Sequence, residues 1–172
     1  MTETRPRVVA LEALLLVEKG ESATATLDRL LKSSALDTRD RGLVTELVDG
    51  TLRWQGRLDY QLQQVLDRPL DSLEQPILLI LRLGVYQMTM LERIPPHAAV
   101  NESVELARRY GHEGTAKLVN AVLRRIAKPE AAPDFPDPQT DPVGFLATAY
   151  SHPAWLVARW LRRFGFAETE AL

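Results

Sequence analysis

The sequence predicts an all-α protein, a bundle of six to seven helices. Apolar residues recur three and four positions apart along most of the chain, which is the period of a helix with one buried face. No stretch alternates strictly between apolar and polar residues, and no Asn-Gly or Asp-Gly pair joins two alternating stretches as a hairpin turn would. Proline and glycine divide the helical stretches at short intervals, which is typical of bundles with short connections.

The first half of the bundle follows from apolar stripes and the residues that stop them. An apolar stripe over residues 8–15 predicts a helix that ends near Gly20, and residues 27–31 predict a short second helix. Apolar pairs four positions apart over residues 43–66 predict a long helical segment that stops before the next proline. Gly56 is the expected place for that segment to break in two.

The next helix is predicted to be the centre of the bundle. Ser72 to Gln75 matches the pattern of a capping box, and Pro76 follows in the expected first turn. Residues 77–91 then carry apolar side chains on nearly every side. A helix of this kind is stable only when other helices surround it.

Two further stripes complete the predicted bundle. Pro95 and Pro96 precede a stripe over residues 100–107 that stops at Gly111. A last stripe over residues 118–126 ends before a proline at position 129. We therefore expect one helical domain over residues 1–128.

The chain changes character after the bundle. Residues 129–142 hold five of the eleven prolines and four acidic residues, with no basic residue. This composition predicts a semi-rigid acidic linker, with a reach of up to about 43 Å if it is extended like polyproline.

Residues 143–172 return to a helical pattern and form a predicted C-terminal extension. Six of the eleven aromatic residues fall in this stretch. The apolar side of its helix is expected to contain Trp155, Leu156, Trp160, Leu161 and Phe164. We expect this side to pack on a further domain, because the pattern is still running at Leu172 without a capping residue.

Composition excludes several kinds of site. The chain has no cysteine, which excludes disulfides, thiolate zinc ligands and a cysteine nucleophile within it. The three histidines are never at metal-ligand spacing, and no Gly-x-Gly occurs. No apolar run is long enough to span a bilayer, and the N-terminus lacks the layout of a signal peptide. We therefore expect a cytoplasmic protein with no metal and no membrane partner.

Four motifs carry a more specific resemblance. They are Asp40-Arg41 with Glu46 to Arg53, then Leu81 to Met88, then Pro95 to Ala107, and finally Leu118 to Arg124. In this order and spacing the chain resembles the NusB-like RNA-binding fold. Within that superfamily it looks most like the N-terminal domain of RsmB-type ribosomal RNA methyltransferases. Ser151 to Val157, followed by Arg159-Trp160, resembles the segment that leads into their methyltransferase domain.

The resemblance implies a function for the longer protein. Enzymes of this type methylate C5 of a cytosine in small-subunit ribosomal RNA, with S-adenosylmethionine as methyl donor and a cysteine as nucleophile. This chain has neither the glycine-rich cofactor loop nor any cysteine. We therefore expect a non-catalytic part with no cofactor site of its own, which binds ribosomal RNA and contacts a methyltransferase domain of the same protein.

Arginines are the candidate RNA ligands, because a guanidinium pairs with phosphate in a two-point geometry. The candidates are Arg5, Arg7, Arg53, Arg57, Arg108, Arg109, Arg124 and Arg125. The first two match the basic N-terminal end that the resemblance implies for RNA contact, and the next two are expected to share one helix face. The last four end two helices, where cations also stabilise the helix dipole.

Other polar residues are interpreted as structural. Asn101, Glu102, Glu105 and Asn120 match the family pattern but have no nucleophile or metal set beside them. Glu105 is expected to pair with Arg108 or Arg109 along its helix. The histidines fit loop or capping roles.

Two alternatives to the main interpretation remain open at this stage. One is a transcription antitermination factor of the NusB type, and the other is a bundle that only braces a catalytic domain. The net charge of −2 keeps the second alternative open.

Overall fold

A computed structural model describes residues 5–172, and over this range the chain is helical without any strand. The α-helices are α1 (Pro6–Glu18), α2 (Ala23–Ser33), α3 (Thr38–Arg53), α4 (Gln55–Val65), α5 (Gln75–Met90), α6 (Pro96–Tyr110), α7 (Glu113–Ile126), α8 (Pro142–Ala149) and α9 (Ala154–Ala171). Two short 3₁₀ helices are η1 (Leu70–Ser72) and η2 (Pro129–Ala131). The predicted all-α fold is confirmed.

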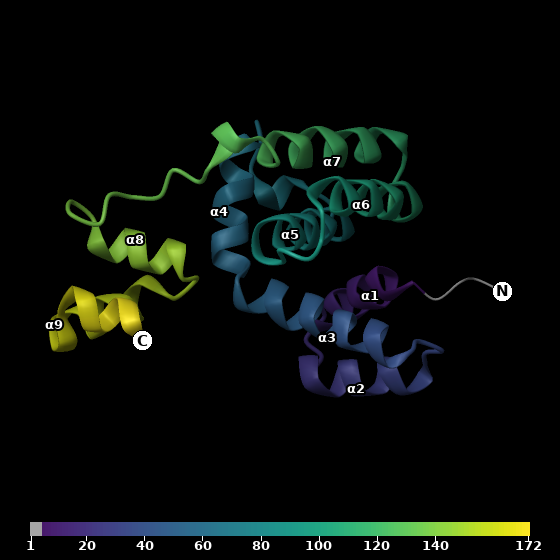
Figure 1. Cartoon of the computed structure of the whole chain (residues 1–172), viewed down its shortest axis with the longest axis horizontal. Coiled ribbons are helices and arrows are strands. Elements are labelled where there is room, and N and C mark those ends of the chain that lie inside the picture. Colours follow the sequence, from purple (N-terminus) through teal and green to yellow (C-terminus); the bar gives the residue numbers. More distant parts are fainter. Residues whose placement is uncertain (1–4) are drawn as a thin grey trace.

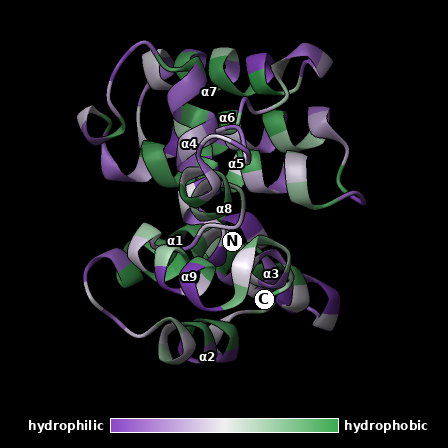
Figure 2. Ribbon diagram, turned by 90° about the vertical axis from the view of Figure 1, so that its left-hand side faces the viewer, coloured by the Kyte–Doolittle hydropathy of each residue, from purple (hydrophilic) through white to green (hydrophobic). Residues whose placement is uncertain are grey.

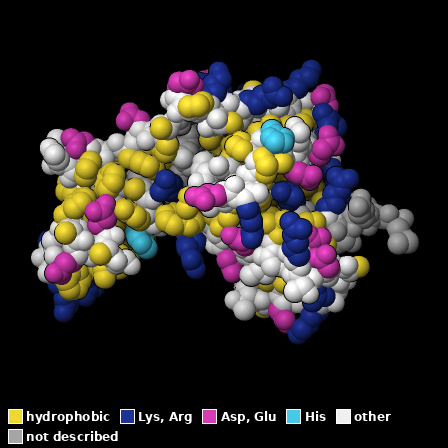
Figure 3. Space-filling view, in the orientation of Figure 1, with side chains coloured by type: hydrophobic (Ala, Val, Ile, Leu, Met, Phe, Trp, Pro, Cys, Tyr) yellow, Lys and Arg dark blue, Asp and Glu magenta, His cyan; other side chains and the backbone are white. Residues whose placement is uncertain are grey.

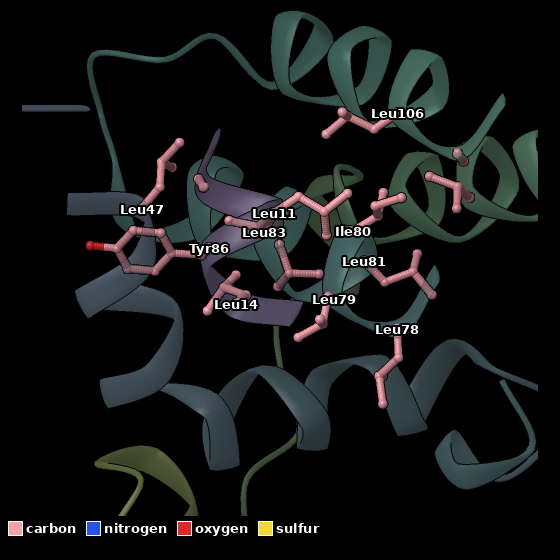
Figure 4. Packing of buried hydrophobic residues seen from close by; sticks show 14 of the residues in the cluster. Leu11, Leu14, Leu47, Leu78, Leu79, Ile80, Leu81, Leu83, Tyr86 and Leu106 are labelled. Carbon is pink, nitrogen blue, oxygen red and sulfur yellow. The ribbon is translucent and has the colours of Figure 1, made fainter. Parts of the chain in front are cut away.

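Helix α5 lies at the centre of the bundle (Figure 1), as predicted. Every residue from Ile77 to Gln87 is buried, and α1, α3, α4, α6 and α7 all pack against it. Leucines of α1, α3 and α6 surround its side chains (Figure 4), and the apolar faces of the surrounding helices point inward (Figure 2). Burial of this largely apolar helix stabilises the bundle.

Two predicted features of helix ends are wrong. The break in the long segment falls at Trp54 and not at Gly56, because Trp54 leaves the helical region (φ −98°, ψ 11°) and ends α3. The predicted capping box at Ser72 does not form. Ser72 belongs to η1, where its hydroxyl donates to the carbonyl of Pro69 at 2.6 Å, and Glu74 precedes α5 without a side-chain cap.

An ion pair between buried Arg82 and half-buried Asp59 ties α5 to its neighbours. The guanidinium of Arg82 donates to both carboxylate oxygens of Asp59 on α4, at 2.7 and 2.9 Å. Glu18 of α1 approaches the same guanidinium at 3.5 Å. Arg82 is 6% exposed, so its charge depends on these two carboxylates for compensation.

The C-terminal extension packs against α4 (Figure 1). Residues 132–141, within the predicted linker, form no helix. They are anchored where the carbonyl of Asp134 accepts hydrogen bonds from Tyr60 (2.7 Å) and Gln64 (2.9 Å), and Phe135 stacks on Tyr60. Helix α8 then begins at Pro142. The segment is therefore held along the bundle and does not act as a free spacer.

The aromatic residues of the extension divide between an inner and an outer side. Phe145 packs against Phe135, Tyr150 and Phe166. Trp155 takes no part in this packing and is 68% exposed on α9. The exposed large hydrophobic side chains of the described residues all lie on α9 or at its end, and they are Trp155, Phe164 and Leu172.

Candidate nucleic-acid interface

The structure divides the eight predicted arginines among three separate places. The start of α1 and the end of α6 hold Arg5, Arg7, Arg108 and Arg109; the junction of α3 and α4 holds Arg53 and Arg57; the end of α7 holds Arg124 and Arg125. Lys and Arg side chains gather at the end of the bundle near the start of α1 (Figure 3), whereas hydrophobic side chains cover much of the visible face of the extension.

The first group surrounds two neighbouring hollows. Arg5, Arg7 and Arg109 line a depression of about 140 Å³ together with Glu102 and Glu105. Arg7 also lines a groove of about 700 Å³ between α1, the start of α3 and the α5–α6 loop. The start of α1 therefore lies between two surface hollows, each large enough to admit parts of a nucleotide.

Arg7 is held in place from the core. Its Nε donates to Oε1 of Gln87 at 2.7 Å, and Gln87 is fully buried on α5, where its Nε2 donates to the carbonyl of Leu83 at 3.0 Å. This bond uses one nitrogen of the guanidinium and fixes the side chain at the rim of the groove. A fixed side chain loses less conformational entropy when it binds a ligand.

The groove adds two arginines that the sequence analysis missed, Arg39 and Arg93. Arg93 is paired with Glu46, while Arg39 is exposed and forms no hydrogen bond or ion pair within residues 5–172. We define the N-terminal arginine surface as Arg5, Arg7, Arg39, Arg93 and Arg109. No sequence signal identifies this set, because it comes from α1, α3, α6 and one loop.

Arg108 is neutralised locally and is not part of this surface. It donates to Glu113 at 2.9 Å and is also paired with Glu105, which confirms the predicted pairing along α6. The hydrogen bond from Arg108 lowers the pKa of Glu113 below its usual value. Arg109 lies over the ring of Tyr110 at 5.8 Å, and burial raises the pKa of that tyrosine.

Arg53 and Arg57 do not share one face, because the helix breaks between them at Trp54. Arg53 is exposed. Arg57 points into the packing between α4 and the extension, where it donates to the carbonyl of Ala149 at 3.0 Å. Its guanidinium also lies 5.1 Å from the ring centre of Phe135 and 5.8 Å from that of Trp54. The geometry favours a structural role for Arg57.

The arginines at the end of α7 make intramolecular hydrogen bonds. Arg124 donates to Oδ1 of Asn120 at 3.0 Å, one turn earlier on the same helix. Arg125 donates to the carbonyl of Val65 at 2.8 Å and so ties α7 to the end of α4. These contacts support helix and bundle structure.

Replacing Arg57 with alanine is expected to loosen the extension while the bundle stays folded. The change removes the hydrogen bond to Ala149 and two aromatic contacts, so local opening of α8 and α9 becomes more frequent. Limited trypsin digestion is expected to cleave after Arg159, Arg162 and Arg163 about fivefold faster than in the original chain. Arg53→Ala is the matched control, since it removes a neighbouring arginine without such contacts. Equal cleavage rates in the two variants would contradict the structural role.

The remaining polar candidates have structural surroundings. His112 caps α7 as predicted, with Nδ1 accepting from the backbone N–H of Gly114 at 3.0 Å. Within the described residues no group of acidic or histidine side chains is arranged to hold a metal ion. No helix in that range has the length and apolar character needed to cross a membrane.

The fold and this surface define an all-helical domain with one buried central helix and an arginine-lined end. A family model described as "NusB family" matches residues 4–128. The chain belongs to the NusB family, which confirms the resemblance carried by the sequence motifs.

Relatives of known name extend the match beyond this region. The chain is 43% identical over its whole length to "Probable ribosomal RNA small subunit methyltransferase B" of Bacillus subtilis and covers 38% of that protein. It is 41% identical to "Ribosomal RNA small subunit methyltransferase B" of Thermus thermophilus, over 95% of this chain and 37% of the relative. The chain thus spans less than two fifths of the length of these relatives.

Solved structures agree on the fold. NusB of T. maritima has a TM-score of 0.67 at 26% identity, over 77% of this chain and 96% of that one. A structure titled "Crystal Structure of PH0851" has a TM-score of 0.71 at 18% identity and covers 98% of this chain but 38% of its own length. The second similarity includes the extension, and at 18% identity it is evidence for a shared fold alone.

Proposed function

We propose that this chain is the RNA-binding domain of an S-adenosylmethionine-dependent methyltransferase that acts on C5 of a cytosine in small-subunit ribosomal RNA. The observation that carries the proposal is the full-length match, at 43% identity, to a relative named ribosomal RNA small subunit methyltransferase B. Since the chain spans 38% of that relative, the remainder of the longer protein supplies the chemistry. The protein works in the cytoplasm, where ribosomal RNA is modified.

The residues of this chain do not fit the methyl donor. A Rossmann-type cradle for this adenosine-containing cofactor needs a strand, a glycine-rich loop and a helix, whereas the described residues contain no strand and the sequence has no Gly-x-Gly. The cysteine nucleophile of such enzymes is also absent from the sequence. The role of this chain is therefore to hold the RNA and to contact the methyltransferase domain of the same protein.

The N-terminal arginine surface is the proposed contact for RNA phosphates. Arg7 is fixed by Gln87 and lines both hollows, Arg39 lines the larger one and is exposed without a protein partner among the described residues, and Arg109 lines the smaller one. A guanidinium held in this way binds phosphate oxygens through two parallel hydrogen bonds. The acidic residues that line the same hollows, among them Asp40 and Glu102, limit non-specific attraction of nucleic acid.

A binding measurement tests this proposal. Fluorescence anisotropy of the chain with a hairpin from small-subunit ribosomal RNA, over a salt series, is expected to show binding that weakens with salt and exceeds that of duplex DNA of equal length. Arg39→Ala and Arg109→Ala are each expected to weaken binding about three- to tenfold and to reduce the salt slope by about one unit.

Lys19→Ala is the control, because it removes a charge at the opposite end of α1. Absence of binding at low salt would reject RNA recruitment and favour the bundle as a brace for the catalytic domain. If Arg39→Ala, Arg109→Ala and Lys19→Ala bind the hairpin with the same affinity, the N-terminal arginine surface is not the RNA contact.

A NusB-type antitermination factor is the remaining alternative, and it is excluded if the reading frame continues into a methyltransferase domain.

A further inference from the structure

Helix α9 has an unusual segregation of charge. Residues 130–172 contain six acidic residues and three arginines, and all three arginines lie on α9. From Ala154 to Ala167 there is no acidic residue. The start of α9 is therefore a local basic surface within an acidic part of the chain.

An aromatic side chain lies on the same face as two of these arginines. Trp155, Arg159 and Arg162 are spaced four and three residues apart, which places them along one side of the helix. Trp155 is 68% exposed, and both arginines are exposed. Within residues 5–172 neither arginine forms an ion pair or hydrogen bond.

The opposite side of α9 packs against the protein. Val157 is buried, and Trp160 is half-buried with its ring 5.4 Å from that of His152. Packing thus explains Val157 and Trp160 but not Trp155. Trp155, Arg159 and Arg162 therefore present an exposed indole beside two guanidinium groups without a partner among the described residues.

A groove lies between the bundle and the residues that precede α9. It has a volume of about 340 Å³ and lies between the α3–α4 junction and the α8–α9 turn, where Arg53, Gln55, His152 and Pro153 are among the lining residues. Its acidic residue, Asp59, is already neutralised by Arg82. Arg53 is exposed and forms no hydrogen bond or ion pair with the described residues, so the groove is basic at the bundle end and leads to the start of α9.

We propose that the outer face of α9, with this groove, binds an unpaired stretch of RNA. One base stacks on the indole of Trp155, Arg159 and Arg162 bind the flanking phosphates, and Arg53 binds a phosphate at the bundle end of the groove. Stacking on an aromatic side chain beside arginines is the general way in which proteins hold single strands. A duplex cannot use this site in the same manner, because its bases are already stacked on one another.

Charge favours RNA for this face over the further protein domain on which the sequence pattern predicts Trp155 to pack. Burying two unpaired arginines against a protein is unfavourable unless acidic groups meet them, whereas every nucleotide of a strand supplies a phosphate. The site is separate from the N-terminal arginine surface. The proposal rests on the proposed function, because both take RNA as the ligand.

The test uses a fluorescent eight-nucleotide RNA without secondary structure and measures anisotropy with the whole chain. Trp155→Ala is expected to weaken binding five- to fiftyfold, and Trp155→Phe, which keeps an aromatic ring, at most threefold. The double variant Arg159→Ala/Arg162→Ala is expected to weaken binding about tenfold and to lower the salt slope by about 1.4 units. The double variant Lys19→Ala/Lys32→Ala removes the same charge elsewhere and is expected to change little.

Each outcome supports or rejects the proposal. We expect the circular dichroism spectrum to be unchanged in every variant, because all five substituted residues are exposed. An unchanged spectrum excludes unfolding as the cause of weaker binding. No binding of the octanucleotide, or equal binding by Trp155→Ala and the original chain, overturns the site. Loss of self-association in Trp155→Ala with unchanged RNA binding identifies α9 as a protein interface and also overturns it. The two proposed sites are tested separately. The hairpin assay with Arg39→Ala tests the N-terminal arginine surface, and the octanucleotide assay with Trp155→Ala tests the face of α9.

Discussion

Replacing Asp59 with alanine is expected to lower the free energy of unfolding by about 3 kcal/mol. The substitution leaves the guanidinium of Arg82 in the core with Glu18 at 3.5 Å as its remaining ionic partner. Arg82 is 6% exposed, so water replaces the two lost hydrogen bonds only in part, from the groove that Asp59 lines. Urea denaturation followed by circular dichroism measures the effect as a change in midpoint.

Two controls separate the buried pair from ion pairs in general. Lys32→Ala breaks the exposed pair with Asp28 on α2 and is expected to cost less than about 0.5 kcal/mol. The double variant Asp59→Leu/Arg82→Met replaces both charges with apolar side chains and is expected to come within about 1 kcal/mol of the original stability. A loss in the double variant as large as in Asp59→Ala would show that packing, and not an unpaired charge, causes the effect.

Two glycines of α3 are expected to respond in opposite directions to the same substitution. A Cβ at Gly50 would lie 2.0 Å from the ring of Tyr86, inside the core, while a Cβ at Gly42 would meet nothing within 4 Å. Gly50→Ala is therefore expected to destabilise the protein by about 2–3 kcal/mol through overpacking. Gly42→Ala is expected to stabilise it by up to about 1 kcal/mol, since alanine favours the helix.

Gly42 and Gly50 lie on the same helix, so the difference in thermal unfolding between Gly42→Ala and Gly50→Ala measures the effect of the close contact between Gly50 and Tyr86. Combining Gly50→Ala with Tyr86→Leu removes the ring that causes the clash, and we expect this pair to be less destabilised than the sum of its single variants. Strict additivity would indicate that the ring of Tyr86 is not the source of strain.

The core of the fold was predictable from the sequence because its signals are local. The apolar character of residues 77–91 is enough to identify a central helix, and glycines at positions 20 and 111 mark helix ends without reference to the rest of the chain. The break at Trp54 was not predictable. Gly56 carries the glycine signal of a break, whereas Trp54 carries no local signal, and α4 beyond the break packs on α5 and α8, far away in the sequence.

The candidate site was less predictable, for a spatial reason. Arginine content and the resemblance identify arginines as RNA ligands, but they do not show which of them converge. Arg39 and Arg93 join Arg7 only because α3 and the α5–α6 loop meet beside α1. Helical spacing predicts that Arg57 lies on the surface with Arg53. Its hydrogen bond to Ala149 escapes that prediction because the contact spans 92 residues, a distance over which periodicity carries no information.

The burial of α5 has a consequence for hydrogen exchange. The amides of Ile77 to Gln87 lie in a helix that other helices enclose, so solvent reaches them only when those helices separate. Their exchange with deuterium therefore proceeds through global unfolding, while α2 and α9, which cover less of the core, exchange through local opening. The protection of α5 amides thus measures the free energy of unfolding of the whole bundle in native solution, without denaturant.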